Sequence, residues 1–413
     1  MSISETIEFE KRMGYLHTSL LMKKGSSMKR LLFSLPALLL IALYSCAPVV
    51  DEELAESLKP VREKFAPDRR VAVFTVTVER QGRMVVAKGE VDNSEAKTEA
   101  LAALSAASGK DVVDSILVLP DPALGEKTFG IVTVSVGNMR SKPGHPQELG
   151  TQVLMGMVVR ILKEQRGWCY VQSHDKYLGW LEEGSMKVTD ERGVEEWLRA
   201  SKVITTAYFG IVRQRPDVKS LPVTDVVTGV LLARGRKAGA WQAVGLPNGQ
   251  TGFIEASVVR EYDAWKRSRK LNGENVEAAA KLFVGVPYLW GGTSAKGFDC
   301  SGYTKTVFRL NGLELNRDAN QQALMGEEVP VGSDFNGLKK GDLLFFGRKG
   351  DEERPERIWH VGIYLGEKEF IHCAGRVRIN SFDERAPHYD PERLNTFVRA
   401  RRVIGISSIP EVG

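Results

Sequence analysis

The sequence predicts a multidomain α+β protein, and three observations lead to that prediction. The chain has 413 residues, which is more than one ordinary domain needs, and its apolar (43%) and charged (26%) fractions are typical of a globular protein. Its middle third contains an internal repeat. On both sides of the repeat, segments that alternate as strands occur together with segments that have helical spacing. We expect three or four domains.

Residues 1–46 are predicted to be a targeting segment. Met28-Lys29-Arg30 is a basic start, and the apolar run over 31–43 is too short to cross a bilayer with ease. The run ends in Leu43-Tyr44-Ser45-Cys46, which resembles a bacterial lipoprotein box and implies that Cys46 carries a lipid. The protein would then be lipid-anchored in the cell envelope, at the periplasmic face or in the outer membrane. Since Met28 begins a complete signal, we expect the true start there. A plain signal peptide and an uncleaved anchor are the alternatives.

Residues 47–69 are polar and charged, and we expect a tether. Residues 70–125 are predicted to form a small α+β domain with ββαβ order. Its elements are strands over 71–79 and 84–91 around Gln81-Gly82, a helix capped by Asn93-Ser94 that runs to about residue 107, and a strand over 112–119. We assign no activity to this unit.

A repeat with a spacing of 73 residues follows. Arg140, Pro143, Gly156, Trp168 and Gly179 recur as Arg213, Pro216, Gly229, Trp241 and Gly252. Short strands, turn residues and a Gly-aromatic pair near the end of each copy predict two small barrels. They resemble bacterial SH3-like β-barrels over 129–188 and 202–260. Such barrels imply binding of cell-wall peptides or, alternatively, a spacer role. Residues 189–200 are expected to form a linker helix.

Residues 270–405 contain a cysteine that is placed for nucleophilic chemistry. Cys300 follows a loop-like stretch and precedes apolar residues at helical spacing over 303–310, so we predict that it begins a helix. A thiol attacks a carbonyl as the thiolate, and the positive end of a helix dipole favours that anion. We therefore expect the helix to promote ionisation of Cys300, with an imidazole close by.

Two histidines are the candidate partners of Cys300. Strands over 359–364 and 368–373 are predicted around Leu365-Gly366-Glu367, and His360 and His372 are equidistant from Gly366. In a symmetric antiparallel register the two imidazoles lie opposite each other, close enough for one to orient the other. The same alternation sends Cys373 to the other face as a buried structural thiol.

Six ordered blocks between about Asn275 and Arg402 resemble the NlpC-type papain-like cysteine peptidases, which cut bacterial cell-wall peptides. The blocks are Pro287-Tyr288-Leu289-Trp290-Gly291-Gly292, Asp299-Cys300-Ser301-Gly302, Leu315-Asn316-Arg317-Asp318-Ala319, Lys340-Gly341-Asp342-Leu343-Leu344-Phe345-Phe346, His360-Val361-Gly362-Ile363-Tyr364 and Phe370-Ile371-His372. The resemblance implies a papain-like domain in which Cys300 is the nucleophile, His360 the general base and His372 the residue that orients it.

The same resemblance implies the surroundings of the nucleophile. Tyr288, Trp290, Asp299 and Ser301 would shape the acyl-side pocket, and the Cys300 amide with the Tyr288 hydroxyl would stabilise the oxyanion. No metal or organic cofactor is needed. The alternative is a degenerate, non-catalytic cell-wall-binding lipoprotein.

The two copies of the repeat differ where a substrate could bind. Glu148 and Tyr177 of the first copy correspond to Leu221 and Gln250 of the second. In relatives with paired barrels, the first barrel closes one end of the active-site groove and supplies such groups to hold the free amine of the substrate. Asp318 resembles the third member of that amine-binding set.

This combination resembles the γ-D-glutamyl-L-diamino acid endopeptidases. It implies hydrolysis of murein peptides that carry a free N-terminal L-alanine. A general murein hydrolase that acts on intact wall and an acyltransferase of a related type are the alternatives.

Charge and cysteine content argue against other classes of protein. The formal net charge is +5, of which the first 45 residues contribute +3 through six Lys or Arg and three Glu. Nucleic acid is therefore not indicated as a partner. Four cysteines in separate segments do not make a disulfide framework. We expect a monomer.

Overall fold

The computed structural model describes residues 49–81 and 84–405. The targeting segment, with the predicted lipid on Cys46, lies outside the described residues, and so does Gly82 of the turn expected in the α+β unit. In the part of the chain that is described, no helix is long and apolar enough to cross a membrane.

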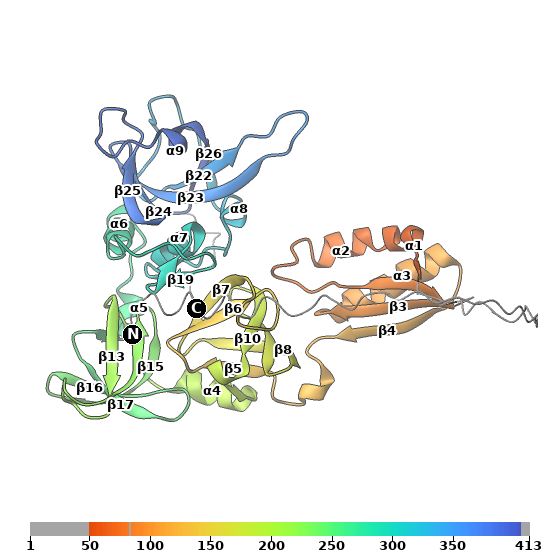
Figure 1. The fold of residues 1–413 in the computed structure, drawn as a ribbon, viewed down its shortest axis with the longest axis horizontal. Helices are drawn as coiled ribbons and strands as arrows, with labels where there is room; N and C mark the ends of the chain where they lie inside the picture. The colour runs from red at the N-terminus through yellow and green to blue at the C-terminus, as the bar shows by residue number, and fades with distance from the viewer. Residues whose placement is uncertain (1–48, 82–83, 406–413) are drawn as a thin grey trace, which may run out of the picture. The chain divides into compact units, whose positions relative to one another are not determined.

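The N-terminal unit, residues 49–125, is a four-stranded sheet with three α-helices. Figure 1 shows this unit in red to orange. Its strands, in sheet order, are β1 (Val49–Val50), β2 (Thr77–Gln81), β3 (Met84–Val91) and β4 (Val112–Val118), of which β3 and β4 are parallel. The predicted helix is confirmed as α3 (Ser94–Ser108). Asn93 caps it by accepting hydrogen bonds from the amides of Glu95 and Ala96.

The predicted tether over 47–69 is wrong. Most of this segment forms α1 (Glu52–Ser57) and α2 (Lys59–Phe65), which belong to the core of the N-terminal unit with α3. Leu54, Leu58 and Val61 are spaced by four and three residues and are buried. Ten of the residues 51–69 are charged, so the amphipathic pattern was hidden in an apparently polar segment. The first predicted strand is also shorter than expected, because β2 begins at Thr77.

The first and second repeats, residues 129–188 and 202–260, are seven-stranded antiparallel sheets with the same strand order. In the first repeat the order is β11 (Met186–Thr189), β5 (Phe129–Val132), β8 (Val158–Gln165), β9 (Trp168–Gln172), β10 (Leu178–Glu182), β6 (Val136–Arg140) and β7 (Leu149–Leu154). In the second repeat it is β18 (Val259–Glu261), β12 (Lys202–Thr205), β15 (Leu231–Ala238), β16 (Trp241–Gly245), β17 (Thr251–Glu255), β13 (Phe209–Arg213) and β14 (Pro222–Val227). The linker helix is present as α4 (Glu191–Arg199).

The spacing of 73 residues is also kept in the hydrogen bonds of the repeats. Nη1 of Arg140 donates to the carbonyl of Gln147 at 2.6 Å, and Nη1 of Arg213 donates to the carbonyl of Ser220 at 2.7 Å. In each copy the arginine fixes the loop before the next strand. In the first repeat that loop carries Glu148.

The C-terminal domain, residues 270–405, packs helices against a six-stranded sheet (Figure 1). The sheet order is β21 (Glu327–Val329), β26 (Phe397–Arg402), β22 (Leu343–Arg348), β23 (Arg357–Gly366), β24 (Glu369–Ala374) and β25 (Arg376–Ser381). The remaining elements are α6 (Gly273–Lys281), β19 (Thr293–Ser294), β20 (Gly297–Phe298), α7 (Cys300–Arg309), α8 (Ala319–Gln322) and α9 (Pro391–Asn395), and α5 (Tyr262–Arg267) leads in from the second repeat. Cys373 is fully buried in the core that holds Tyr303 and Val307 of α7.

The C-terminal domain shares its core with the second repeat and docks against the first. One cluster of buried apolar side chains runs from Val212 and Val226 of the second repeat to Phe283 and Val307 of the C-terminal domain. On the other side, the amide of Thr293 donates to Oε1 of Gln152 on β7 at 3.0 Å. Gly291 has a φ of +77°, and a Cβ there would stand 2.3 Å from the carbonyl oxygen of Leu149. Only glycine permits this close approach.

Candidate active site

Cys300 begins helix α7, as predicted. Asp299 is the N-cap, and its Oδ1 accepts a hydrogen bond from the amide of Gly302 at 2.7 Å. The first amides of a helix lack acceptors within the helix, so the Cys300 amide is available to an oxyanion. The Sγ atom lies 4.0 Å from the carbonyl oxygen of Trp359, the residue before His360.

The helix N-terminus favours ionisation of Cys300, as expected, but burial outweighs this effect in the resting protein. Burial and the adjacent Asp299 carboxylate raise the pKa of Cys300 to about 12, although the amides of Val361 and Ser301 and the guanidinium of Arg317 act in the opposite direction. The N-cap that starts the helix also places a negative charge beside the thiol, and segments distant in sequence bury it. Cys300 is therefore a neutral thiol until a base removes its proton.

The two histidines meet, but not in the predicted register. His372 lies opposite Gly362, and the chain reverses through Glu367 and Lys368, which both have positive φ. The centre of the hairpin is thus one residue later than Gly366, and the pairing is displaced by two residues. Because a strand alternates with a period of two, both imidazoles still lie on one face of the sheet, as diagonal neighbours.

A third polar side chain completes the row. Nε2 of His360 lies 2.8 Å from Nδ1 of His372, and Nε2 of His372 lies 3.1 Å from Oδ1 of Asn380 on β25. Sequence reasoning missed Asn380. The available signal was the position of Asn380 in the strand after Gly375. It is two residues from Arg378, which lies opposite His372, so its side chain is on the same face of the sheet as His372.

A backbone carbonyl fixes the protons of this row. Nδ2 of Asn380 donates to the carbonyl oxygen of His388 at 3.3 Å, so Oδ1 is the atom that faces His372. Nε2 of His372 must then donate to Oδ1. Burial lowers the pKa of His372 to about 4, so at neutral pH its Nδ1 is an acceptor and receives a hydrogen bond from Nε2 of His360.

The proton of the His360 ring is therefore on Nε2, and Nδ1 carries a lone pair. Burial and the neighbouring His372 hold the pKa of His360 well below its usual value, so this lone pair is free at neutral pH. An imidazole in this tautomer can accept a proton from a thiol. The hydrogen bonds of Cys300 and His360 do not include one between them in this structure, and such contacts commonly tighten only when a substrate is bound.

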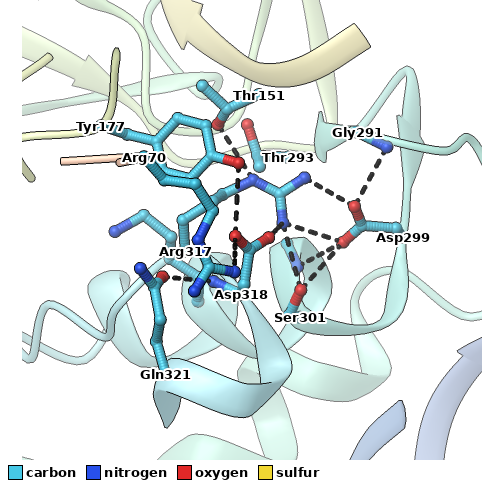
Figure 2. Close-up of polar contacts among 12 residues, drawn as sticks. Arg70, Thr151, Tyr177, Gly291, Thr293, Asp299, Ser301, Arg317, Asp318 and Gln321 are labelled. Atoms are coloured by element: carbon cyan, nitrogen blue, oxygen red, sulfur yellow. Dashed lines mark hydrogen bonds and ion pairs between the residues drawn. The ribbon is translucent and has the colours of Figure 1, made fainter. Parts of the chain in front are cut away.

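Asp299 and Ser301 face inward and bind Arg317 (Figure 2). Arg317 is buried and forms a bidentate ion pair with Asp299, with Nη1 to Oδ1 at 3.1 Å and Nη2 to Oδ2 at 2.5 Å. Its Nη1 also donates to the hydroxyl of Ser301, and its Nε donates to the hydroxyl of Thr151 on β7. These side chains therefore position the nucleophile helix against the first repeat. Arg317 stands in a block that resembles the family, but sequence reasoning gave it no role.

Tyr288 and Trp290 lie at the surface near the nucleophile. Tyr288 is 37% exposed, and burial of its phenol with the nearby Cys300 and Asp299 raises its pKa, so it keeps its proton and can donate a hydrogen bond. Trp290 is 62% exposed, and its indole Nε1 donates to Oε1 of Glu148 at 2.9 Å.

The predicted amine-binding set is only partly assembled. Tyr177 lies beside Asp318, and its hydroxyl donates to Oδ2 at 3.2 Å across the contact between the first repeat and the C-terminal domain. Burial and the Asp318 carboxylate raise the pKa of Tyr177. Glu148 instead holds Trp290, and none of its hydrogen bonds in the described structure reaches Tyr177 or Asp318.

Metal ligands are not grouped in the described part of the chain. No cluster there brings together three or more His, Cys, Asp or Glu side chains that could hold a metal ion.

Comparisons with known proteins agree with this geometry. Residues 285–393 match the NlpC/P60 family, and residues 139–186 match the bacterial dipeptidyl-peptidase Sh3 domain. The chain is 28% identical over 279 residues to dipeptidyl-peptidase 6 of Lysinibacillus sphaericus, which covers 64% of this chain and 96% of that protein. It is 32% identical over 237 residues to the γ-D-glutamyl-L-lysine dipeptidyl-peptidase of Bacillus subtilis, which covers 54% of this chain and 71% of that protein.

A solved structure supports the fold. The crystal structure of an NlpC/P60 family protein from Bacillus cereus matches with a TM-score of 0.57 and 23% identity, over 67% of this chain and 99% of that one. The site combines a buried cysteine at a helix N-terminus with a His-His-Asn row, and the chain matches these relatives over most of their length. The chain belongs to the NlpC/P60 family and is a cysteine peptidase.

Proposed function

We propose that this peptidase hydrolyses the γ-D-glutamyl-L-diamino acid bond of murein peptides that have a free N-terminal L-alanine. The observation that carries the proposal is the pair Tyr177 and Asp318. The phenol of the first repeat donates to the carboxylate of the C-terminal domain. Arg317 links this carboxylate to Asp299, the N-cap of the nucleophile helix. The names of the bacterial relatives support the same reaction.

Cys300 would act as the nucleophile and His360 as its base. Nδ1 of His360 takes the thiol proton while Sγ bonds to the γ-glutamyl carbonyl carbon, so the charge never rests on an unassisted thiolate. The Cys300 amide and the Tyr288 hydroxyl stabilise the oxyanion. When the C–N bond breaks, His360 returns its proton to the leaving amine of the diamino acid. Water then attacks the thioester, gives its proton through His360 to sulfur, and releases the dipeptide as a carboxylate.

The amine site would explain why a free N-terminus is required. An ammonium group needs a carboxylate and hydrogen-bond acceptors, and Asp318 supplies the charge at the boundary between the two domains. In the structure this carboxylate already holds a cation, the guanidinium of Arg70, at 2.7 Å. Glu148, which accepts a hydrogen bond from the exposed Trp290, would complete the wall of the site. An N-acylated peptide has no positive charge at this position, so it cannot form the ion pair with Asp318.

The test compares L-Ala-γ-D-Glu-diamino acid peptides with their N-acetylated forms by mass spectrometry of the products. We expect cleavage of the free-amine peptide at the γ-glutamyl bond, at least tenfold lower kcat/KM for the acetylated peptide, and no turnover by Cys300→Ala. Equal rates on both peptides would return the assignment to a general murein hydrolase, transfer to an added amine would indicate an acyltransferase, and no turnover would indicate a binding module. We propose further that a lipid on Cys46 holds the enzyme in the cell envelope.

A further inference from the structure

Arg70 places a positive charge in the predicted amine site. It lies in the N-terminal unit, between α2 and β2, 248 residues before its partner. Its Nη1 donates to Oδ2 of Asp318 at 2.7 Å (Figure 2). The same nitrogen donates to Oδ1 of Asn320 at 3.0 Å. The hydroxyl of Tyr177 donates to the same Oδ2 atom. Both donors that reach this oxygen therefore come from outside the C-terminal domain.

The segment that carries Arg70 is fixed to the first repeat. The amide of Leu178 donates to the carbonyl of Arg70 at 2.8 Å, and Nε2 of Gln172 donates to the carbonyl of Val71 at 3.0 Å. A small apolar cluster joins the two parts next to this point, formed by Val73, Leu119, Leu162 and Leu178. The interface between the N-terminal unit and the first repeat thus holds the guanidinium of Arg70 against Asp318.

Arg70 has a second carboxylate partner, Asp68. Nε and Nη2 of Arg70 donate to Asp68 at 2.9 and 2.7 Å, and Nε2 of Gln321 donates to the same carboxylate at 2.7 Å. The pairing with Arg70 lowers the pKa of Asp68 to about 2, so it is ionised at neutral pH. Asp68 holds one edge of the guanidinium, formed by Nε and Nη2, and Asp318 holds Nη1. The contact to Asp318 can therefore be given up while the contacts to Asp68 remain.

Arg70 occupies the oxygen of Asp318 that also contacts Tyr177. Oδ2 of Asp318 already accepts two hydrogen bonds, which is the number its lone pairs accommodate in the plane of the carboxylate. A second cation placed there would also be repelled by the first. The other oxygen, Oδ1, lies 3.9 Å from Nη1 of the buried Arg317. An ammonium that binds at Oδ2, beside Tyr177, must therefore displace Nη1 of Arg70.

We propose that Arg70 is a specificity-determining residue, an internal cation from the N-terminal unit that competes with the substrate ammonium for Asp318. The inference rests on the proposed amine recognition. It gives the N-terminal unit a role, because the position of Arg70 sets how tightly free-amine peptides bind. The side chains of Arg70 and Asp318 are 32% and 25% exposed, so water weakens their attraction. We therefore expect the competition to change KM for free-amine peptides only severalfold.

The experiment is steady-state kinetics of the full chain on the free-amine and N-acetylated peptides. Arg70→Ala should lower KM for the free-amine peptide by about two- to tenfold, with kcat and the rate on the acetylated peptide nearly unchanged. Asp68→Asn should raise KM, because Arg70 is then left with Asp318 as its one anionic partner. If these contacts were merely structural, their loss would change KM in the same direction in both variants. Arg69→Ala, an exposed neighbour of the same charge, is the matched control and should keep the KM of the unmutated enzyme.

The outcomes separate the two proposals. If the unmutated enzyme does not distinguish the free from the acetylated peptide, amine recognition fails and this inference fails with it. If it does distinguish them while KM is unchanged or higher in Arg70→Ala, only the competition by Arg70 is refuted. Should Arg70→Ala not fold, a KM for Asp68→Asn at or below that of the unmutated enzyme would refute it.

Discussion

His372 lies directly across the sheet from Gly362, and a Cβ atom at position 362 would stand 3.2 Å from the Cβ of His372. The glycine leaves room for His372 to lean toward its diagonal neighbour His360, to which it is joined at 2.8 Å. A side chain at this position would have to displace His372 by a few tenths of an ångström.

We therefore predict that Gly362→Ala lowers kcat by about three- to tenfold, because the imidazole row is misaligned while the substrate site is untouched. Gly184→Ala is the control, since a Cβ there meets nothing within 4 Å. The measurement is kcat and KM with thermal unfolding of each variant. An unchanged kcat in a normally folded Gly362→Ala would contradict this role of the glycine.

Asn380 should hold His372 through its acceptor oxygen. Replacing it by Leu removes the acceptor, so we expect kcat to fall by about ten- to hundredfold. Asn380→Asp keeps an acceptor but adds a carboxylate, which raises the pKa of His372 from about 4. Protonated His372 cannot accept from His360, so the acid limb of the kcat/KM profile should move to higher pH in that variant. Asn395→Asp, at an exposed position, should leave the profile in place.

The neutral state of Cys300 predicts how it reacts with alkylating agents. Since its pKa is raised to about 12, the thiolate fraction grows about tenfold per pH unit throughout the neutral and mildly alkaline range. The rate of alkylation by iodoacetamide should rise from pH 7 to pH 9 without a plateau. Cys300 should still react before Cys169 and Cys373, because it is 7% exposed and they are fully buried. A plateau below pH 8 would instead indicate a thiolate-imidazolium pair at rest.

A buried lysine should stabilise the contact between the first repeat and the C-terminal domain. Nζ of Lys305 pairs with Glu314 and, at 3.1 Å, with Asp175 of the first repeat, and all three side chains are at most 14% exposed. Lys305→Met leaves two buried carboxylates without their cation and should lower the free energy of unfolding by about 3–5 kcal/mol. Lys296→Ala breaks a pair with Asp225 whose lysine is 44% exposed, and it should cost about 1 kcal/mol or less. Chemical unfolding of both variants tests this, and equal losses would contradict it.

The lipid anchor is a prediction from the sequence of the targeting segment. Native protein should partition into the detergent phase, and mass spectrometry should find a lipid on Cys46 at the mature N-terminus. Cys46→Ser should abolish both. An unmodified Cys46 at the N-terminus of native material would rule the anchor out.

The sequence determined the features that depend on residues within a few positions of each other. Asp299 before Cys300 caps a helix, Asn93 caps another, and the turn and strand signals repeat after 73 residues in both copies. The period of two along a strand placed His360 and His372 on one face even though the register was displaced by two residues. Local hydrogen-bond geometry and side-chain periodicity suffice for these features.

The tertiary structure decided what depends on distant segments. The segment predicted as a tether forms two helices, because Leu54, Leu58 and Val61 pack into the apolar core of the N-terminal unit. The thiol of Cys300 is neutral because remote strands remove it from water, and the His-His row acquired Asn380 from a third strand. Arg70 reaches Asp318 across 248 residues. Burial, pairing between strands and the charge that faces a carboxylate are properties of the folded neighbourhood, and no short pattern in the chain encodes them.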